Sequence, residues 1–307
     1  MKIFIPLLVV TLICCWLAVL GTITLGRKSD GFSYGYQVMG QGCTIEVVDD
    51  DRQSASFTLV DHKPPCVFNS AWSPDHNYAA IRNYNTGTLS IATRYTRTEW
   101  LDVFNVEGVE VLQGSPVWSS DSQQFSFFTN TKDTTVIGII RMENAVPGKP
   151  LFFTVNAVRP VAYSPPVWSP DGQFLAFAAY ASRGQGNEEL YTINVNTGEV
   201  RRLTDNHFRD DTPSWSPDGS QLVFTSAEDG YNELHIINVV TGERHQLTRF
   251  TFGYTPSWSP DGRRIMFTSN IDHGHDLYLI NVDGSGLRRL TNNHYSGSVF
   301  PIWLFPS

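Results

Sequence analysis

The stretch Ser214-Trp215-Ser216-Pro217-Asp218-Gly219 decides the fold, because closely similar stretches recur along the chain. Four other copies share a Trp-Ser pair with Asp two positions later, and they lie at residues 71–76, 117–122, 167–172 and 257–262. A shortened copy at residues 301–306 keeps the tryptophan. Successive tryptophans of the repeat are 46, 50, 47, 43 and 45 residues apart. This spacing predicts a repeat of four short strands joined by turns.

The residues of this stretch are those of a tight hairpin turn. Pro217 fixes φ at the first central position, Asp218 can accept hydrogen bonds from the backbone N–H groups that follow, and Gly219 tolerates a positive φ. An apolar run comes after each turn, as at residues 222–224, and predicts a strand that is buried on both faces. A third strand is predicted over residues 233–238, and the fourth strand ends in a Leu-Thr pair.

Sheets with two apolar faces must be covered on both faces, and radial stacking around one axis achieves this. The repeats therefore predict an all-β fold, a β-propeller. A linear β-solenoid is the alternative, although its repeats are generally shorter. The shortened copy supplies one strand, over residues 299–304, and three β-prone runs within residues 32–60 supply its partners. We therefore predict a single six-bladed β-propeller over residues 29–307, with its last blade shared between these two segments.

The turn, the apolar strand after it and the Leu-Thr endings together resemble the repeats of TolB-like β-propellers, which are relatives in shape of WD-repeat propellers. The resemblance covers about residues 60–307 and is strongest over residues 160–295. Two copies depart from the turn pattern, since Ser120 and Ser122 replace Pro and Gly in one and His76 replaces Gly in another. The resemblance implies the propeller fold and leaves the function open.

The charge of the chain argues against a nucleic-acid partner. The formal net charge is −8, but Lys2, Arg27 and Lys28 flank the apolar N-terminus. Removing these three from the 22 basic residues leaves 19 against 30 acidic residues, so the chain from residue 29 onward carries about −11. Such a surface repels phosphate backbones, and no cluster of Lys and Arg interleaved with aromatic residues reverses the sign locally.

The N-terminal segment, residues 1–28, is predicted to be a membrane anchor. Residues 3–26 contain no charged side chain, and a helix of this length can cross a hydrocarbon core of about 30 Å. A cleaved signal peptide is the alternative, which would release the propeller as a secreted protein. The basic residues on the two sides of the segment nearly balance, so they do not decide its orientation. We expect the propeller outside the cytoplasm, at the cell envelope.

Cysteine usage bears on the compartment. Cys43 and Cys66 are the two cysteines outside the apolar segment. They are candidates for a disulfide in an oxidising compartment, and two ordinary buried thiols are equally compatible with the sequence.

Strand order predicts which loops face a ligand. The Ser-Pro-Asp-Gly and Thr-Gly turns share one face, whereas the loops from strand two to strand three and from strand four to the next blade share the other and vary in sequence. Their aromatic, His and Arg residues are typical of protein interfaces, although some rings could instead fill the central channel. The candidate binding residues are His207, Phe208, Arg209, Asp210, Asp211, Tyr231, Phe250, Phe252, Tyr254, His294 and Tyr295.

Two functional hypotheses follow. The first is a monomeric, non-catalytic propeller that binds a protein or peptide, or acts as a scaffold, at the envelope, with no cofactor expected and no catalytic residue assigned. The second is a metal-dependent enzyme, for example a carbohydrate lyase, with its site in the propeller funnel. Asp272, His273 and His275 are the candidate metal ligands, and a solvated polar loop is the simpler interpretation of the same residues. Metal binding distinguishes the two hypotheses.

Overall fold

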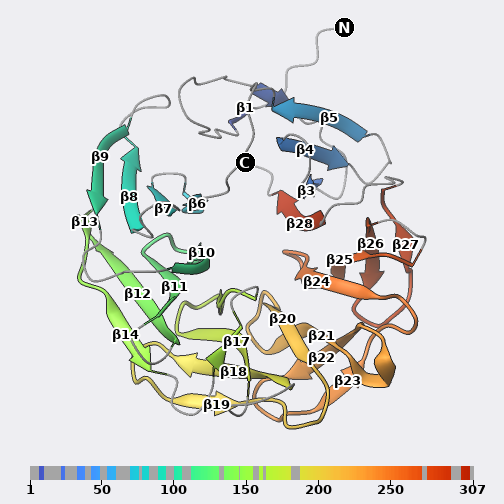
Figure 1. Cartoon of the computed structure of the whole chain (residues 1–307). Helices are drawn as coiled ribbons and strands as arrows, with labels where there is room; N and C mark the ends of the chain where they lie inside the picture. Colours follow the sequence, from blue (N-terminus) through green and yellow to red (C-terminus); the bar gives the residue numbers. More distant parts are fainter. Residues whose placement is uncertain are drawn as a thin grey trace, which may run out of the picture.

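A computed structural model describes residues 7–9, 22–24, 33–38, 43–48, 54–59, 70–75, 78–82, 89–94, 100–105, 112–130, 135–144, 146–154, 159–161, 164–180, 187–271, 275–291 and 299–304. Apart from one turn of 3-10 helix, η1 (Glu228–Gly230), every regular element of these residues is a β-strand. The strands form six sheets of four or five strands and one two-stranded pair. The larger sheets are arranged around a central axis (Figure 1).

The sheets between the two chain ends follow the chain order from the axis outward. The first of them contains β6 (Ser70–Trp72), β7 (Tyr78–Arg82), β8 (Leu89–Arg94) and β9 (Trp100–Asn105). The next contains β10 (Leu112–Trp118), β11 (Gln124–Asn130), β12 (Thr135–Glu143), β13 (Val146–Pro147) and β14 (Leu151–Thr154), with β12 paired to both β13 and β14. The third contains β15 (Arg159–Pro160), β16 (Val167–Trp168), β17 (Phe174–Tyr180), β18 (Glu188–Asn194) and β19 (Val200–Arg202).

Two sheets come from the part of the chain with the most regular repeats. One contains β20 (Asp210–Trp215), β21 (Gln221–Ser226), β22 (Glu233–Asn238) and β23 (Arg244–Gln246). The other contains β24 (Gly253–Trp258), β25 (Arg264–Ser269), β26 (Asp276–Asn281) and β27 (Arg288–Arg289). All neighbouring strands in them are antiparallel.

The remaining large sheet combines strands from the two ends of the chain. Its order is β28 (Val299–Leu304), β3 (Ser33–Val38), β4 (Cys43–Val48) and β5 (Ser54–Leu59). Strands β28 and β3 pair antiparallel over their full length, from Val299 opposite Val38 to Leu304 opposite Ser33. The backbone ladder thus joins residues that are far apart in sequence.

The N-terminal segment differs from the predicted helix at the six residues that are described there. Strands β1 (Leu7–Val9) and β2 (Thr22–Thr24) form an antiparallel pair. Their β-branched residues favour extended backbone over helix. Among the ranges that the structure covers, no helix is long and apolar enough to span a membrane.

The recurring turn has the predicted geometry. In all five copies the serine hydroxyl donates to the aspartate carboxylate two residues later, at 2.5 to 2.6 Å. Gly219 has a φ of 72°, which is the left-handed conformation expected at this position. Ser122 adopts φ 61° at the same position, so the copy without proline and glycine still forms the turn.

The core lies between neighbouring sheets, as expected for strands with two apolar faces. Trp258, Ile265 and Phe267 of one sheet are buried against Val223 and Ile236 of the sheet before it. The tryptophans also connect sheets through hydrogen bonds. The Nε1 of Trp168 donates to the carbonyl of Val117 at 2.8 Å, and the same atom of Trp215 donates to Val167 at 3.1 Å.

Candidate functional site

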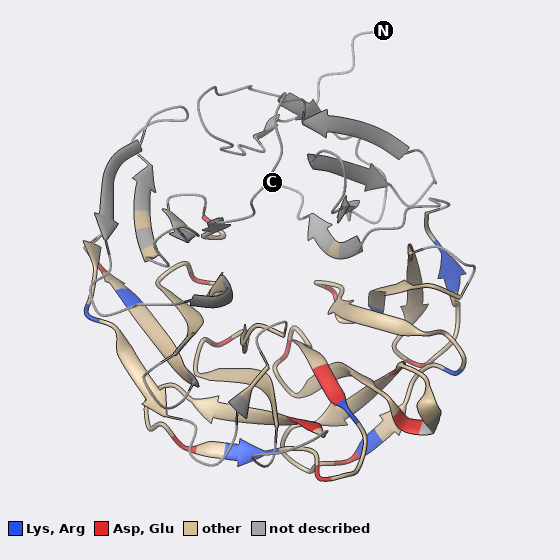
Figure 2. Cartoon of the chain, in the orientation of Figure 1, with Lys and Arg blue, Asp and Glu red and all other residues tan. Residues whose placement is uncertain are grey.

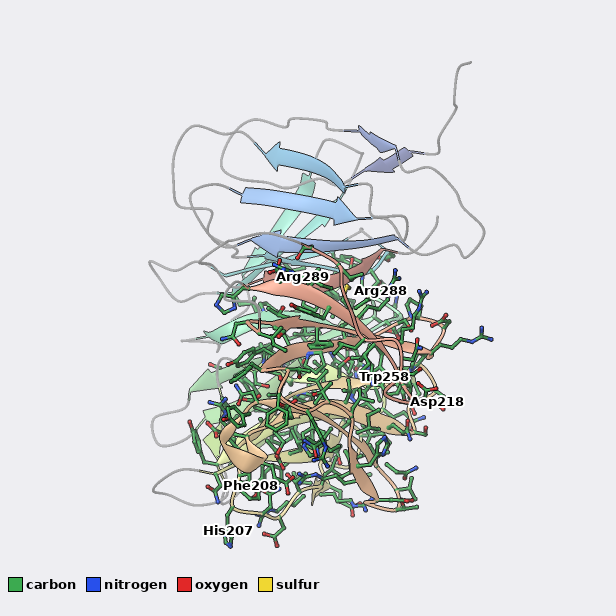
Figure 3. All side chains as sticks on the ribbon, turned by 90° about the vertical axis from the view of Figure 1, so that its right-hand side faces the viewer. His207, Phe208, Asp218, Trp258, Arg288 and Arg289 are labelled. Carbon is green, nitrogen blue, oxygen red and sulfur yellow. The ribbon has the colours of Figure 1, made fainter. Side chains whose placement is uncertain are left out.

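Three connecting segments of the two regular sheets lie together at one face. The loop between β21 and β22, residues 227–232, contacts the segments that lead into β20 and β24. Ala227 donates its N–H to the carbonyl of Arg209 at 2.9 Å, and Gly253 donates to the carbonyl of Asn232 at 2.7 Å. We call this side the loop face. The edge-on view in Figure 3 shows Phe208 projecting at one side of the molecule and Asp218 of the recurring turn at the other.

An aromatic cluster of Tyr231, Phe250 and Phe252 lies on the loop face. The ring of Tyr231 meets Phe252 edge-on, with centroids 5.1 Å apart and planes at 89°, and it meets Phe250 at 5.9 Å and 70°. Phe250 is 64% exposed and Tyr231 is 40% exposed. Large aromatic side chains with this exposure are typical of protein-binding surfaces. Sequence reasoning named all three residues, but only the fold brings the two loops together.

The backbone that carries the two phenylalanines is strained. Phe250 has φ 59° and Phe252 has φ 47°, in the left-handed region that bulky residues rarely adopt. Each such residue costs about 1–3 kcal/mol, and it persists only when the surroundings hold it in place. Thr251, between them, is buried and provides this restraint.

A buried carboxylate holds this segment. Glu233 is the first residue of β22 and is 2% exposed. It accepts hydrogen bonds from the Thr251 N–H at 3.0 Å and the Thr251 hydroxyl at 2.9 Å. It also accepts one from the Thr248 hydroxyl at 2.7 Å, and that hydroxyl in turn accepts the Leu234 N–H. Thr248 and Thr251 of the connection are thereby tied to the third strand of the sheet.

The same carboxylate clamp recurs in the next sheet, and sequence reasoning missed it. The signal is an acidic residue followed by Leu at the start of the third strand, with Thr 15 residues after the acid. In the next sheet the Thr291 hydroxyl donates to Asp276 at 2.8 Å and accepts the Leu277 N–H. The Leu-Thr endings of the repeat therefore fasten the fourth strand to the third.

Two of the sequence candidates, Asp210 and Asp211, are buried below the loop face. Figure 2 shows this acidic segment on the inner strand β20. Asp210 is 0% exposed and accepts a hydrogen bond from the Asn206 amide at 2.7 Å. Burial raises the pKa of its carboxyl, and that hydrogen bond acts in the opposite direction. Both aspartates support the loops from beneath, with Asp211 in an ion pair to Arg209 at 3.3 Å.

Some charged side chains of the loop face have ion-pair partners, and one arginine has none among the described residues. Two acidic side chains of the loop face have arginine partners, since Asp205 pairs with Arg202 at 2.8 Å and Glu228 pairs with Arg244. Arg249 precedes Phe250 and is exposed, and within the described ranges its side chain has no hydrogen-bond or ion-pair partner. An exposed arginine thus directly precedes the most exposed ring of the cluster in the sequence.

The other candidates are dispersed. His207 and Phe208 are exposed on the segment before β20, and Tyr254 is half-buried in β24. Arg209 bonds through its Nη2 to the Asn232 side chain at 2.9 Å, which ties this segment to the loop that carries Tyr231. The candidates that lie outside the described residues are His294, Tyr295, Asp272, His273 and Cys66.

The predicted metal ligands and the disulfide stay untested for this reason. His275 is half-buried just before β26, and Cys43 is the first residue of β4. Within the described residues, no three His, Cys, Asp or Glu side chains lie together as a metal site would require.

One short pattern in the chain matches the Gly-x-Ser-x-Gly sequence of serine hydrolases, at residues 31–35. In those enzymes the serine stands at a sharp turn from a strand into a helix. Here Ser33 begins strand β3, which pairs on both sides with other strands. The structural context therefore differs from that of a catalytic serine.

Solved structures share this fold. The putative TolB from Agrobacterium tumefaciens has a TM-score of 0.61 at 18% identity and covers 91% of this chain and all of that one. An oligogalacturonate lyase in complex with manganese has a TM-score of 0.60 at 17% identity and covers 83% of this chain and 72% of the lyase. At these identities the likeness shows the fold alone.

Sequence relatives match shorter segments. The Tol-Pal system protein TolB of Francisella tularensis subsp. mediasiatica is 30% identical over 86 residues, which are 28% of this chain and 19% of that protein. The uncharacterized peptidase YuxL of Bacillus subtilis is 42% identical over 60 residues, 20% of this chain and 9% of the peptidase. The chain thus spans less than a fifth of the length of these curated relatives.

The family model of the TolB β-propeller domain matches residues 35–303, which is most of the chain. This match and the all-strand sheets confirm the all-β propeller predicted from the repeats. The chain belongs to the TolB β-propeller domain family.

Proposed function

We propose that this protein is a non-catalytic binding propeller that holds a protein or peptide partner on its loop face. The observation that carries the proposal is the exposed aromatic cluster, Tyr231, Phe250 and Phe252, on a backbone held by Glu233. Aromatic side chains dominate binding energy at protein interfaces. A platform that is rigid before binding loses little conformational entropy on binding.

Strain supports a functional role for the cluster. Phe250 and Phe252 both adopt positive φ, whereas a glycine or asparagine would adopt this backbone with less strain. The cost is offset by the buried hydrogen bonds to Thr251, so the fold maintains an unfavourable local conformation that exposes a large ring.

A site-specific photo-crosslinking experiment tests the proposal. A benzophenone amino acid replaces Phe250 in one full-length variant and Val240 in a control variant, and both are expressed in the organism that encodes the chain. Val240 is 74% exposed in the turn between β22 and β23, at the opposite face, so it reports random encounters. We expect a discrete crosslinked product at position 250 that is absent at position 240. No product at position 250, or the same products at both positions, overturns the proposal.

We also propose that the six sheets form one closed, six-bladed ring over residues 29–307. The ladder between β28 and β3 supports this, because it replaces the loop entropy of free chain ends with backbone hydrogen bonds. Deleting residues 299–307 should then lower Tm substantially, and an unchanged melting curve would contradict the closed ring.

The location of the protein is a further proposal. We propose that residues 3–26 tether a monomeric propeller to the membrane at the cell envelope, because this run of 24 residues contains no charged side chain and is long enough to enter the hydrocarbon core. Membrane fractionation of the full chain and of a variant without residues 1–28 tests the tether. Recovery of the full chain in the soluble fraction would contradict it.

A metal-dependent reaction is the second candidate function. It is favoured by the shared fold with a lyase that was solved with manganese, and by His275 at the entrance to β26. Titration with Mn²⁺ while Tm is followed separates the two functions. A rise in Tm that is lost in the His275→Ala variant would support the metal-dependent alternative, and no rise leaves the binding function as the better account.

A further inference from the structure

We propose that the aromatic cluster and Arg249 together form a site for an acidic peptide segment with an aromatic residue at its centre. This inference rests on the proposed binding function and specifies the chemistry of the partner. The structural relationship that carries it is the position of an unpaired guanidinium directly before the most exposed ring of the cluster.

The argument from charge begins with the whole protein. From residue 29 onward the chain carries about −11, so its general surface repels an acidic segment. On the loop face, two exposed or half-exposed acidic side chains already have an arginine partner within the described residues. Asp205 forms an ion pair with Arg202, and Glu228 forms one with Arg244. Glu228 is therefore compensated by Arg244, whereas Arg202 is shared between Asp205 and the buried Glu189 and compensates Asp205 only in part.

Arg249 has no such compensation. It is exposed, and the described part of the chain offers its side chain no carboxylate. Its neighbour Phe250 is fixed by the Thr251 hydrogen bonds, so the backbone from which the arginine extends is fixed as well. A partner carboxylate would find a planar donor group able to form two parallel hydrogen bonds.

Arg209 is a second positive charge close to the cluster, but it is not the main cation of the proposed site. Its guanidinium bonds to Asn232, which adjoins Tyr231, and pairs with the buried Asp211. The charge of Arg209 is therefore already balanced by Asp211. A carboxylate of the partner would gain less binding energy at Arg209 than at Arg249. The site thus favours a partner with an acidic residue on the Phe250 side of its apolar anchor.

The ring geometry favours a peptide side chain over a sugar. Tyr231 stands at 89° to Phe252 and at 70° to Phe250. Rings at such angles form a corner. A compact aromatic side chain in this corner can contact the face of one ring and the edge of another. A uronic acid oligosaccharide carries the same charge, but its puckered rings pack their C–H groups against one open aromatic face and fill a corner poorly. We therefore assign the site to a peptide and leave the oligosaccharide as an outcome of the test.

The test is fluorescence anisotropy with labelled peptides and the purified full chain. The probe is Asp-Asp-Phe-Asp-Asp, and the comparison peptides are Lys-Lys-Phe-Lys-Lys and Asp-Asp-Ala-Asp-Asp. A uronic acid oligosaccharide serves as a competitor. We expect binding of the first peptide alone, weakened by raised ionic strength because the contact is exposed and electrostatic.

Charge reversal identifies the cation. Arg249→Glu should weaken binding of the acidic probe by roughly tenfold or more, and it should create binding of the lysine peptide. Arg263→Glu makes the same change beside the recurring turn on the opposite face and should leave the affinity unchanged. Equal Tm values for the variants and the unmodified chain exclude misfolding, and Arg249→Gln provides a milder change if the reversal lowers Tm.

Three results would overturn the inference. They are binding of the lysine peptide to the unmodified chain, insensitivity of the acidic probe to Arg249→Glu, and tighter binding of the oligosaccharide than of any peptide. The crosslinking experiment separates this failure from that of the proposed function. A product at position 250 without acidic-peptide binding leaves the binding propeller in place and rejects the acidic partner.

Discussion

His235 accepts a hydrogen bond at Nδ1 from the Nε of Arg244, 3.2 Å away, and is thereby held in its neutral form inside the protein. Its ring packs at 5.7 Å against Phe224. Tyr191 and Tyr278 occupy the equivalent positions of the neighbouring sheets, where they stack on phenylalanines in the same way. Of these three sheets, only the one with His235 has an imidazole packed against the phenylalanine at this position.

The first prediction concerns pH. Burial, followed by the positive charge of Arg244, lowers the pKa of His235 from 6.5 to about 3. The unfolded chain therefore binds a proton as the pH falls below about 6.5, whereas the folded protein does not until about pH 3. Stability is lost across this window, by about 2 kcal/mol between pH 7 and pH 5. Denaturant unfolding at the two pH values measures the loss.

His235→Tyr is the matched control, because tyrosine already occupies this position in the two neighbouring sheets. The variant should show a smaller difference in unfolding free energy between pH 7 and pH 5 than the unmodified protein. Equal pH dependence of the two proteins would exclude His235 as its source.

The second prediction concerns the carboxylate clamp. Glu233→Gln keeps the shape of the side chain but replaces one of its two acceptor oxygens with an NH2 group, which donates hydrogen bonds and cannot accept them. Buried donors of Thr248 or Thr251 then lose their acceptor, which should lower the free energy of unfolding by about 1–3 kcal/mol. Glu243→Gln, exposed in the turn after β22, is the control and should change it little. Equal effects in urea unfolding would contradict a role for the clamp.

The third prediction isolates the hydrogen bond between sheets. Trp168 and Trp258 are both buried, but the indole N–H of Trp168 donates to Val117, whereas that of Trp258 has no acceptor in the described residues. Replacement by Phe removes similar volume at both sites. Trp168→Phe should therefore lower the free energy of unfolding by about 1 kcal/mol more than Trp258→Phe does. A larger loss of stability for Trp258→Phe would reverse this assignment.

The fourth prediction concerns Gly138 in β12. A Cβ at this position would clash with the Cζ of Phe127, because the phenyl ring occupies the space above the glycine. It meets Phe152 there, with centroids 6.5 Å apart. Gly138→Ala should destabilise the protein by about 1–3 kcal/mol, since the ring must move within a packed core. Thermal melts measure the loss of stability. Adding Phe127→Leu to the Gly138→Ala variant should recover part of the loss, whereas Phe127→Leu alone should not stabilise the protein.

The local chemistry of the repeat was sufficient to predict the turns and the strands after them. A proline, an aspartate and a glycine at fixed offsets specify a turn without reference to the rest of the chain, as at Gly219. Even Ser122 follows this rule, because its partners Ser119 and Asp121 are retained. The pairing of the two chain ends is not local, but it was predictable because each end contains β-prone runs without partners nearby.

Burial on the loop face could not be derived in this way. Aspartates usually lie at the surface. Asp210 and Asp211 are nevertheless buried, because Asn206 and Arg209 of the connection fold over them. Their exposure depends on which segments cross above them, and that depends on the neighbouring sheet.

The sequence by itself determined the turn chemistry, the strands next to each turn and the residue types available for binding, because each depends on residues that are close in the chain. The tertiary structure alone decided that Tyr231 and Phe250, from two different connections, share one corner, and that Glu233 fixes the strained backbone beneath it. The physical reason is that the side-chain contacts between these loops form only after whole sheets are packed against one another.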